Sequence, residues 1–259
     1  MKLTKIITST ALLASLMVTT MGTSVVSAVS PVGDKKAIEK AMKSDKRSEK
    51  FIMFDANRRP DQVLGFAGVK PGMTVLDINS GGGYYSEILA GVVGNKGMVY
   101  AHNGPVYWSF MKSKDPVAYT NFPNITAIHT GKEAVDLKEN SVDAAISILA
   151  YHDYYFKHAA HSGEDIVAVN KSVYKALKPG GVYVIVDHIG FEGMDEEMMN
   201  KIHRIDPKRV IKEMEAAGFK LDAEHDALKN ANDFPDRSWF GNKVRYSTSR
   251  FIYRFKKVN

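Results

Sequence analysis

Short apolar runs alternate with amphipathic stretches along most of this chain, and the alternation predicts parallel strands separated by helices. A continuous apolar run is typical of a strand that is covered on both faces of a sheet. Such runs predict strands at residues 73–78, 98–101, 125–129, 142–149 and 182–186. Apolar residues three and four positions apart predict helices at 85–93 and 164–177. This order predicts an α/β fold with a doubly wound, mostly parallel sheet.

Further elements are predicted outside this core. Residues 34–57 are polar and helix-permissive, which predicts an N-terminal helical flap. The segment 178–181, Lys-Pro-Gly-Gly, predicts a tight stop before the fifth strand. A Met-rich loop or helix is expected at 193–202. The tail alternates apolar and polar residues over 221–228 and 248–256, which predicts a closing antiparallel hairpin.

The first residues have the pattern of an export signal. Lys2 and Lys5 precede a charge-free stretch, residues 6–28, that ends in Val-Ser-Ala. An uncleaved membrane anchor is the alternative, but the apolar centre is short for a bilayer span and contains Ser, Thr and Gly. We therefore expect a signal peptide at 1–28, export to the periplasm after cleavage behind Ala28, and no stable membrane anchor afterwards. The remainder divides into a helical extension, 29–58, and one domain, 59–259.

Composition narrows the function further. The chain has no cysteine, which excludes disulfides, thiolate metal sites and cysteine nucleophiles. Its formal net charge is +6, to which Lys2 and Lys5 contribute, and the other basic residues are interspersed with acids. Because no basic stripe is present, we expect no nucleic-acid partner. The sequence does not indicate an oligomeric state.

A glycine-rich turn after the first strand is the strongest local signal. The apolar run 75–78 leads into Asn79-Ser80-Gly81-Gly82-Gly83 and then into a predicted helix. Glycine allows the backbone to approach a ligand closely, and the start of the helix directs free N–H groups toward it. The turn therefore predicts a small-ligand site.

Polar residues gather where the other predicted strands end. Asn103 follows the second strand, His152 and Asp153 the fourth, and Asp187 and His188 the fifth. Ligands of doubly wound sheets bind beyond the carboxyl ends of the strands. We therefore expect these side chains and the glycine turn to lie at one edge of the sheet.

Three motifs together resemble a known family. They are Val75-Leu76-Asp77 with Gly81-Gly82-Gly83, Leu177-Lys178-Pro179-Gly180-Gly181, and Glu215-Ala216-Ala217-Gly218-Phe219. In this pattern, residues 59–258 resemble the class I S-adenosylmethionine-dependent methyltransferases, and most closely a bacterial group of exported predicted methyltransferases. The resemblance implies a seven-stranded Rossmann-like sheet, S-adenosyl-L-methionine as the cofactor, and in-line methyl transfer to a small-molecule acceptor.

The resemblance also implies roles for residues of the turn. Asp77 is expected to hold the turn, and Gly81 and Gly83 to let the methionine part of the cofactor lie against the backbone. Asn79 stands where the family has its first glycine, and Asn tolerates left-handed backbone conformations. Asn103 stands at the position whose acid usually bonds the ribose hydroxyls. Glu133 is expected to face the adenine amine.

Catalysis needs a base only if the acceptor carries a proton when it is attacked. His152 is the first candidate, because an imidazole titrates near neutral pH. His188, oriented by Asp187, is the second, and Asp153 belongs to the same catalytic set. The expected acceptor site consists of Tyr154, Tyr155, His203 and Arg204, while Asp206 caps a helix and Trp239 packs in the interior.

Two alternatives remain open. Acidic and imidazole side chains could converge on a divalent metal, namely His152, Asp153, Asp187, His188, His203 and Asp206, although no two histidines have the spacing of a helical zinc motif. We therefore assign no metal ligand. S-adenosylmethionine is made inside the cell, so the second alternative is a non-catalytic periplasmic binding protein of the same fold, for a nucleoside-like ligand or a divalent metal. A nicotinamide enzyme fits less well, because its glycine spacing differs.

Overall fold

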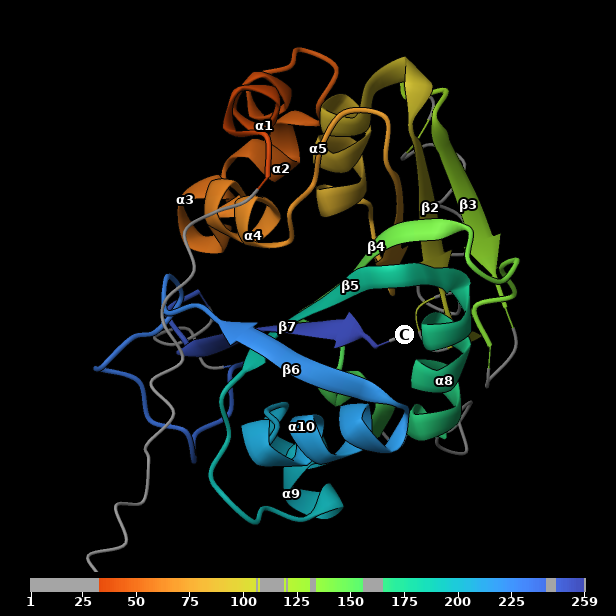
Figure 1. The fold of residues 1–259 in the computed structure, drawn as a ribbon. Coiled ribbons are helices and arrows are strands. Elements are labelled where there is room, and N and C mark those ends of the chain that lie inside the picture. The colour runs from red at the N-terminus through yellow and green to blue at the C-terminus, as the bar shows by residue number, and fades with distance from the viewer. Residues whose placement is uncertain are drawn as a thin grey trace, which may run out of the picture.

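The computed structural model describes residues 33–105, 107, 119, 121–130, 134–155, 165–240 and 246–258. Its centre is a seven-stranded sheet with the order β3-β2-β1-β4-β5-β7-β6 (Figure 1). The strands are β1 (Thr74–Ile78), β2 (Met98–Asn103), β3 (Ile125–His129), β4 (Val142–Ile148), β5 (Leu177–His188), β6 (Phe219–Glu224) and β7 (Arg250–Lys257). The first five are parallel, and β7 is antiparallel to both β5 and β6. The predicted fold class is confirmed.

Helices cover both faces of the sheet (Figure 1). Successive residues of β1 separate the two layers, because neighbouring side chains of a strand point to opposite faces. Val75 packs in the same apolar cluster as Ile88 of α5, whereas Leu76 packs with Val173 of α8. The first cluster also contains residues of α1 and α4, and the second residues of α9 and α10. The helix bounds are α1 (Lys35–Met42), α4 (Pro60–Phe66), α5 (Tyr84–Val93), α8 (Ile166–Ala176), α9 (Glu196–Ile202) and α10 (Pro207–Ala216).

Four short helical segments complete the list of described helices. These are α2 (Glu49–Ile52), α3 (Asp55–Arg58), and the 3-10 turns η1 (Gly94–Lys96) and η2 (His152–Tyr155). The segment η2 directly follows β4 and carries the polar residues predicted there. Asp206 caps α10 as expected, because its carboxylate accepts a hydrogen bond from the Lys208 N–H at 2.8 Å.

The expected tight stop at 178–181 is wrong. β5 begins at Leu177, directly after α8, and continues through these residues. Its register with β4 shifts locally, since Val142 pairs with Leu177 but Ala144 pairs with Val182. Gly180 has a φ of +74°, which lets the strand bulge and return to the ladder. The glycines therefore interrupt the pairing without ending the strand.

The predicted closing hairpin is present, with β7 inserted between β5 and β6. Among the described residues, no helix combines the length and apolar character needed to cross a membrane. The predicted signal peptide, residues 1–28, lies outside the described residues, and the proposed domain division stays a prediction.

Candidate functional site

The glycine turn lies at the carboxyl end of β1 and has the left-handed backbone that its sequence predicts. Asn79, Gly81 and Gly83 have φ values of 51°, 57° and 91°. Gly81 and Gly82 line a cavity of about 180 Å³, which is also lined by Phe54, Tyr107 and the residues Phe51, Arg58, Asn79, Ser80, Tyr84, Ile148 and Leu149. We refer to it as the turn cavity.

The two outer residues of the glycine motif serve different neighbours. A Cβ atom at Gly81 would lie 3.9 Å from the Tyr107 ring, which lines the same cavity. A Cβ atom at Gly83 would lie 2.6 Å from the Tyr119 ring, a distance that no packed side chain tolerates. Gly81 therefore leaves room in the turn cavity, whereas Gly83 makes room for Tyr119.

Asp77 joins β1 to the helix that follows the turn. The Ser86 hydroxyl of α5 donates a 2.6 Å hydrogen bond to the Asp77 carboxylate. Burial raises the pKa of Asp77 to about 7, although the Ser86 hydrogen bond and the charge of Arg58 oppose the shift. This carboxyl group is a structural part of the turn and does not line either cavity described here.

Asn103 braces the turn from the end of β2. Its Oδ1 accepts a hydrogen bond from the Gly81 N–H at 2.9 Å, and its Nδ2 donates to the Ser80 hydroxyl at 3.3 Å. The side chain is completely buried. Asn79 acts similarly, because its Oδ1 accepts from the Gly104 N–H at 2.9 Å. The expected ribose contact of Asn103 would therefore require its amide to exchange a protein partner for a ligand. Glu133 lies outside the described residues.

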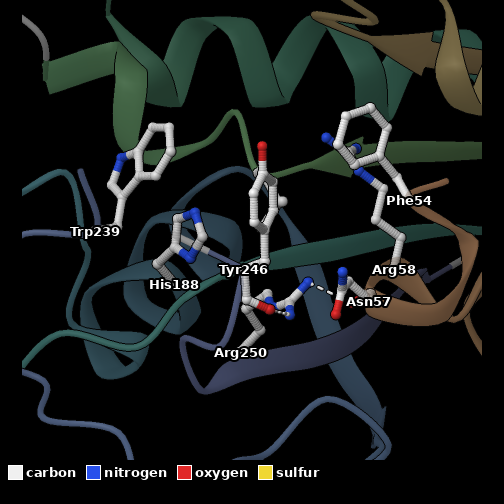
Figure 2. Close-up of a pocket in the computed structure, with 8 residues that line it drawn as sticks. Phe54, Asn57, Arg58, His188, Trp239, Tyr246 and Arg250 are labelled. Carbon is white, nitrogen blue, oxygen red and sulfur yellow. Dashed lines mark hydrogen bonds between the residues drawn. The ribbon is translucent and has the colours of Figure 1, made fainter. Parts of the chain in front are cut away.

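A second cavity, of about 220 Å³, adjoins the turn cavity. It is lined by His188, Trp239, Tyr246 and Arg250, and by Phe54, Asn57, Arg58 and Leu149 (Figure 2). Three of these residues line both cavities, namely Phe54, Arg58 and Leu149. The glycine turn and the histidine region thus border two adjoining cavities, which we together call the cleft, and we call the second of them the His188 cavity.

His152 is held between two carboxylates. Its Nδ1 lies 2.8 Å from Asp187 and its Nε2 lies 3.2 Å from Asp153. Burial opposes protonation, but the charges of the two carboxylates outweigh it and hold the pKa of His152 well above its usual range. The direction of this shift argues against the titration near neutral pH that the sequence suggested. As a buried imidazolium with both nitrogens engaged, it has no lone pair with which to accept a proton.

His188 has the opposite environment. Its Nδ1 lies 2.7 Å from the Thr248 hydroxyl, and its ring stacks on Trp239 with a centroid distance of 5.5 Å. Burial, followed by the positive charges of His152, Arg250 and Arg204, holds the pKa of His188 well below its usual range. The ring is thus neutral at neutral pH. Asp187 does not orient it as expected, because that carboxylate bonds the His152 ring and the backbone N–H of His188.

His152, Asp153 and His203 bring three possible metal ligands together. One nitrogen or oxygen atom from each lies within 4.8 Å of the others. The Nδ1 of His203 is 3.5 Å from the Asp153 oxygen that also contacts His152, and the other Asp153 oxygen accepts from the Tyr107 hydroxyl. Nitrogen and oxygen donors of this kind suit divalent zinc and related metals. The same contacts are also complete as an ionic hydrogen-bond network, because His152 carries a positive charge.

Most of the predicted acceptor residues lie elsewhere. Tyr155 donates a hydrogen bond to Glu213 of α10, and Tyr154 packs edge-on against Tyr151 in the core. Arg204 is fully buried and its guanidinium binds the Asp233 carboxylate. None of the three lines the turn cavity or the His188 cavity, so the structure does not bring them to the cleft, and their role in acceptor binding stays a prediction. Asp206 is also separate, since it caps α10 and accepts from the Gly193 N–H.

Sequence reasoning missed the two arginines of the cleft. Arg58 ends α3, and Arg250 begins β7 among apolar residues. Arg250 is only 6% exposed, and a charged residue at the buried start of an apolar strand was the available signal. Trp239 was expected to pack in the interior, but it lines the His188 cavity.

Comparison with known proteins identifies the fold. No family model and no curated protein sequence matches the chain. Among solved structures it is similar to a SAM-dependent methyltransferase from Aquifex aeolicus, with 19% identity, coverage of 87% of this chain and 99% of that one, and a TM-score of 0.55. It is also similar to a candidate methyltransferase in a complex with the Haloferax volcanii Trm112 methyltransferase activator, with 17% identity, coverage of 86% of this chain and 98% of that one, and a TM-score of 0.54. A candidate sarcosine dimethylglycine methyltransferase from Galdieria sulphuraria has 16% identity, coverage of 82% of this chain and 91% of its own, and a TM-score of 0.53. The chain therefore has the fold of these methyltransferases.

Proposed function

We propose that this protein is an exported S-adenosylmethionine-dependent methyltransferase that acts by in-line transfer to a small-molecule acceptor. The two adjoining cavities carry the proposal, because one borders the glycine turn and the other borders His188. In-line transfer requires donor and acceptor to lie side by side, and alignment with exclusion of water can supply most of the rate enhancement. The fold shared with methyltransferases supports the assignment.

The residues of the turn cavity fit the methionine end of the cofactor. Gly81 and Gly82 expose backbone without side chains, and Asn79 and Ser80 add polar groups to the same wall. The volume of about 180 Å³ is below the roughly 300 Å³ at which small-molecule pockets usually begin. Asn103 would hold the sugar only after its amide turns from Gly81. When bound, S-adenosylmethionine supplies a methyl group on a positively charged sulfur atom.

His188 is the base in this proposal. Its neutral ring lines the acceptor side of the cleft, and the Thr248 hydroxyl fixes its orientation through Nδ1. With Nδ1 protonated and donating to Thr248, Nε2 carries the lone pair that accepts the acceptor's proton. The His152 ring lies beside the His188 ring, with a centroid distance of 5.5 Å, and both nitrogens of His152 contact carboxylates. The burial and the positive charges that keep the His188 ring neutral also make it a weak base, so the proposal requires an acceptor that loses its proton readily as it is attacked.

The alternative is a non-catalytic binding protein with the same fold. It is favoured by one observation, the inward-turned amide of Asn103, which completes the glycine turn without a ligand. A nucleoside-like ligand smaller than the whole cofactor would suit the volume of the turn cavity. Export also separates the protein from the cytoplasm, where S-adenosylmethionine is made.

Calorimetric titration of the purified protein distinguishes these two functions. A methyltransferase binds both S-adenosylmethionine and S-adenosylhomocysteine, and heat from both is the expected result. The protein is then incubated with S-adenosylmethionine carrying a deuterated methyl group and a small-molecule extract, and labelled products are sought by mass spectrometry. A labelled product that disappears with His188→Gln supports catalysis. Absence of heat with both compounds would refute the proposal.

Export is tested separately from catalysis. The leader predicts that the mature protein recovered from the periplasm begins at Val29. N-terminal sequencing or intact-mass measurement gives this directly. Recovery of the full chain from the cytoplasm alone would contradict export and leave the proposed chemistry unaffected.

A further inference from the structure

We propose that the His188 cavity binds an aromatic carboxylate, whose ring packs against the aromatic residues that line the cavity and whose acid group is attracted by the charges of Arg250 and Arg58. The proposal that a ligand binds here depends only on the residues that line the cavity. Its identification as the site of the methyl acceptor rests on the proposed function.

Arg250 places a positive charge at the cavity wall. Among the described residues its guanidinium donates to backbone carbonyls, namely those of Asn57 at 2.9 Å, Thr248 at 3.2 Å and Tyr246 at 3.4 Å. Within the part of the chain that the structure describes, no carboxylate forms an ion pair with it. Asp233 contributes to its electrostatic environment but is bound in two places by Arg204. A buried charge is normally paired, so Arg250 offers a site for an external anion.

Arg58 provides a second cation from another element. It contacts aromatic faces, with its guanidinium carbon 4.7 Å from the Tyr84 ring centroid and 5.7 Å from that of Phe54. Its neighbour Asp55 is engaged by Arg47 and by the Tyr84 hydroxyl. Arg58 therefore forms no ion pair with a carboxylate among the described residues, although its charge acts on the buried Asp77. Two guanidinium groups lining one cavity favour an anion over a neutral ligand.

The remaining walls favour a flat apolar body. Figure 2 shows His188 and Trp239 on one side of Tyr246, and Phe54 and Arg58 on the other. The Phe54 and Tyr246 rings lie 5.8 Å apart, within the range of aromatic pairs. A cavity of about 150 Å³ can hold benzene. The His188 cavity, at about 220 Å³, has room for one ring and an acid group.

The anion has a second conceivable source, the carboxylate of the cofactor's methionine part. The two sources can be separated because Arg58 lines both cavities, whereas Arg250 lines only the His188 cavity. A loss of S-adenosylhomocysteine affinity in a variant of Arg250 would assign that arginine to the cofactor. A loss of aromatic carboxylate affinity alone assigns it to the second ligand.

Calorimetry with benzoate and its neutral analogue benzamide tests the proposal. The titrations use the whole protein, with and without saturating S-adenosylhomocysteine. We expect benzoate to bind at least tenfold more tightly than benzamide, and its affinity to fall as salt is increased. Acetate, which lacks the ring, should bind at least tenfold more weakly than benzoate. Equal affinity for benzoate and benzamide, or no binding of benzoate in either condition, would overturn the proposal.

Variants of the two arginines locate the ligand. Arg58→Gln and Arg250→Lys should each weaken benzoate at least fivefold and leave benzamide unchanged, while Arg59→Gln provides the control because this neighbouring arginine is exposed and lines neither cavity. Thermal unfolding shows whether each variant folds. If Arg250→Lys does not fold, Arg58→Gln and the preference of the native protein for benzoate still decide the question.

The outcome is independent of the cofactor titration. Selective benzoate binding without any binding of adenosyl compounds would keep the anion site and remove the methyltransferase proposal. Binding of the adenosyl compounds without a preference for benzoate would keep the methyltransferase proposal and remove the anion site.

Discussion

The Nδ1 atom of His152 lies 2.8 Å from Oδ1 of Asp187, so the carboxylate at the end of β5 holds the imidazole that follows β4. The second oxygen of Asp187 accepts the backbone N–H of His152 at 2.8 Å. The Oδ1 atom also accepts the backbone N–H of His188 at 2.7 Å. One carboxylate thus fixes two adjacent strand ends. The two histidine rings lie 5.5 Å apart, and their pKa values are shifted in opposite directions.

We expect His152 and His188 to show opposite protonation states over the same pH range. The carboxylates around His152 hold its pKa well above the usual value, whereas burial and nearby positive charges lower that of His188. Nitrogen-detected NMR of the imidazole rings should therefore show a doubly protonated His152 and a neutral His188 at pH 7. His152→Gln and His188→Gln assign the signals. A His152 signal that titrates near pH 6.5 would contradict the network.

The raised pKa of His152 also predicts in which direction the stability of the folded protein changes with pH. A raised pKa in the folded state means that the contribution of His152 is complete below about pH 6.5, its unfolded value, and is lost as the pH rises toward the folded value. The loss is at most about 1.4 kcal/mol per pH unit. Urea unfolding should therefore show a larger stability difference between native protein and His152→Gln at pH 6 than at pH 8.5. A difference that grows with pH would exclude a protonated His152.

Features that depend on consecutive residues could be predicted from the sequence, whereas contacts between residues far apart in the chain could not. The apolar runs identified β1 and β4 closely, because burial on both faces is written into consecutive residues. The glycine turn was equally local. The contacts of Asp187 with His152 and of Arg204 with Asp233 join residues on different elements, and no spacing rule encodes them.

The predicted partner of a side chain differed from the observed one where two possible partners lay within its reach. Asp187 was predicted to orient the ring of His188, the next residue in the chain. Its carboxylate instead contacts the ring of His152, which follows the neighbouring strand β4. Tyr155 follows a strand that ends at the cleft, yet the 3-10 turn η2 directs its hydroxyl to α10. A strand end predicts the edge of the sheet at which a residue lies, and the turn that follows decides where its side chain points.

Asp77→Asn should change the pH dependence of stability. The pKa of Asp77 is raised to about 7 in the folded protein, from about 3.9 in an unfolded chain. Stability from this carboxyl is therefore present below its unfolded pKa and lost as the pH rises through 7. Between pH 5 and pH 8, the free energy of unfolding of the variant, measured with urea, should therefore rise by roughly 2–3 kcal/mol relative to that of the native protein.

Ser86→Ala is the companion to this experiment. The Ser86 hydroxyl stabilises the charged form of Asp77, so its removal should shift the loss of stability to higher pH. An unchanged pH profile in both variants would mean that Asp77 is charged throughout this range.

Gly81→Ala should weaken cofactor binding beyond its effect on folding. The residue has a left-handed φ of +57°, which costs an alanine about 1–2 kcal/mol. Its new methyl group would also reduce the turn cavity beside Tyr107. We expect at least a tenfold loss of S-adenosylhomocysteine affinity by calorimetry. Gly72→Ala is the control, because Gly72 has a φ of +85°, no atom within 4 Å of its Cβ position, and a place at the opposite end of β1. Equal affinities for both variants would remove the turn from the binding site.

Arg204→Met should unfold the protein more readily without a direct effect on any ligand. The guanidinium binds Asp233 at 2.7 and 2.9 Å and also donates to the carbonyls of Ile189 and Arg237. Removing it leaves the buried Asp233 carboxylate without its ionic partner, a change that typically costs about 3–5 kcal/mol. Urea unfolding measures this loss, and Arg237→Gln is the control, because the Arg237 side chain is exposed and stacks on Phe234.

The double variant Arg204→Met, Asp233→Leu separates structural support from ligand binding. It removes both charges, so most of the lost stability should return, since apolar replacements of buried ion pairs are often neutral. Asp233 also accepts the Ser249 N–H at 2.7 Å, next to Arg250 of the His188 cavity. The double variant should therefore fold but bind benzoate more weakly, because the segment before β7 loses its anchor. If Arg204→Met alone kept full stability and lost benzoate affinity, Arg204 would contact the ligand itself.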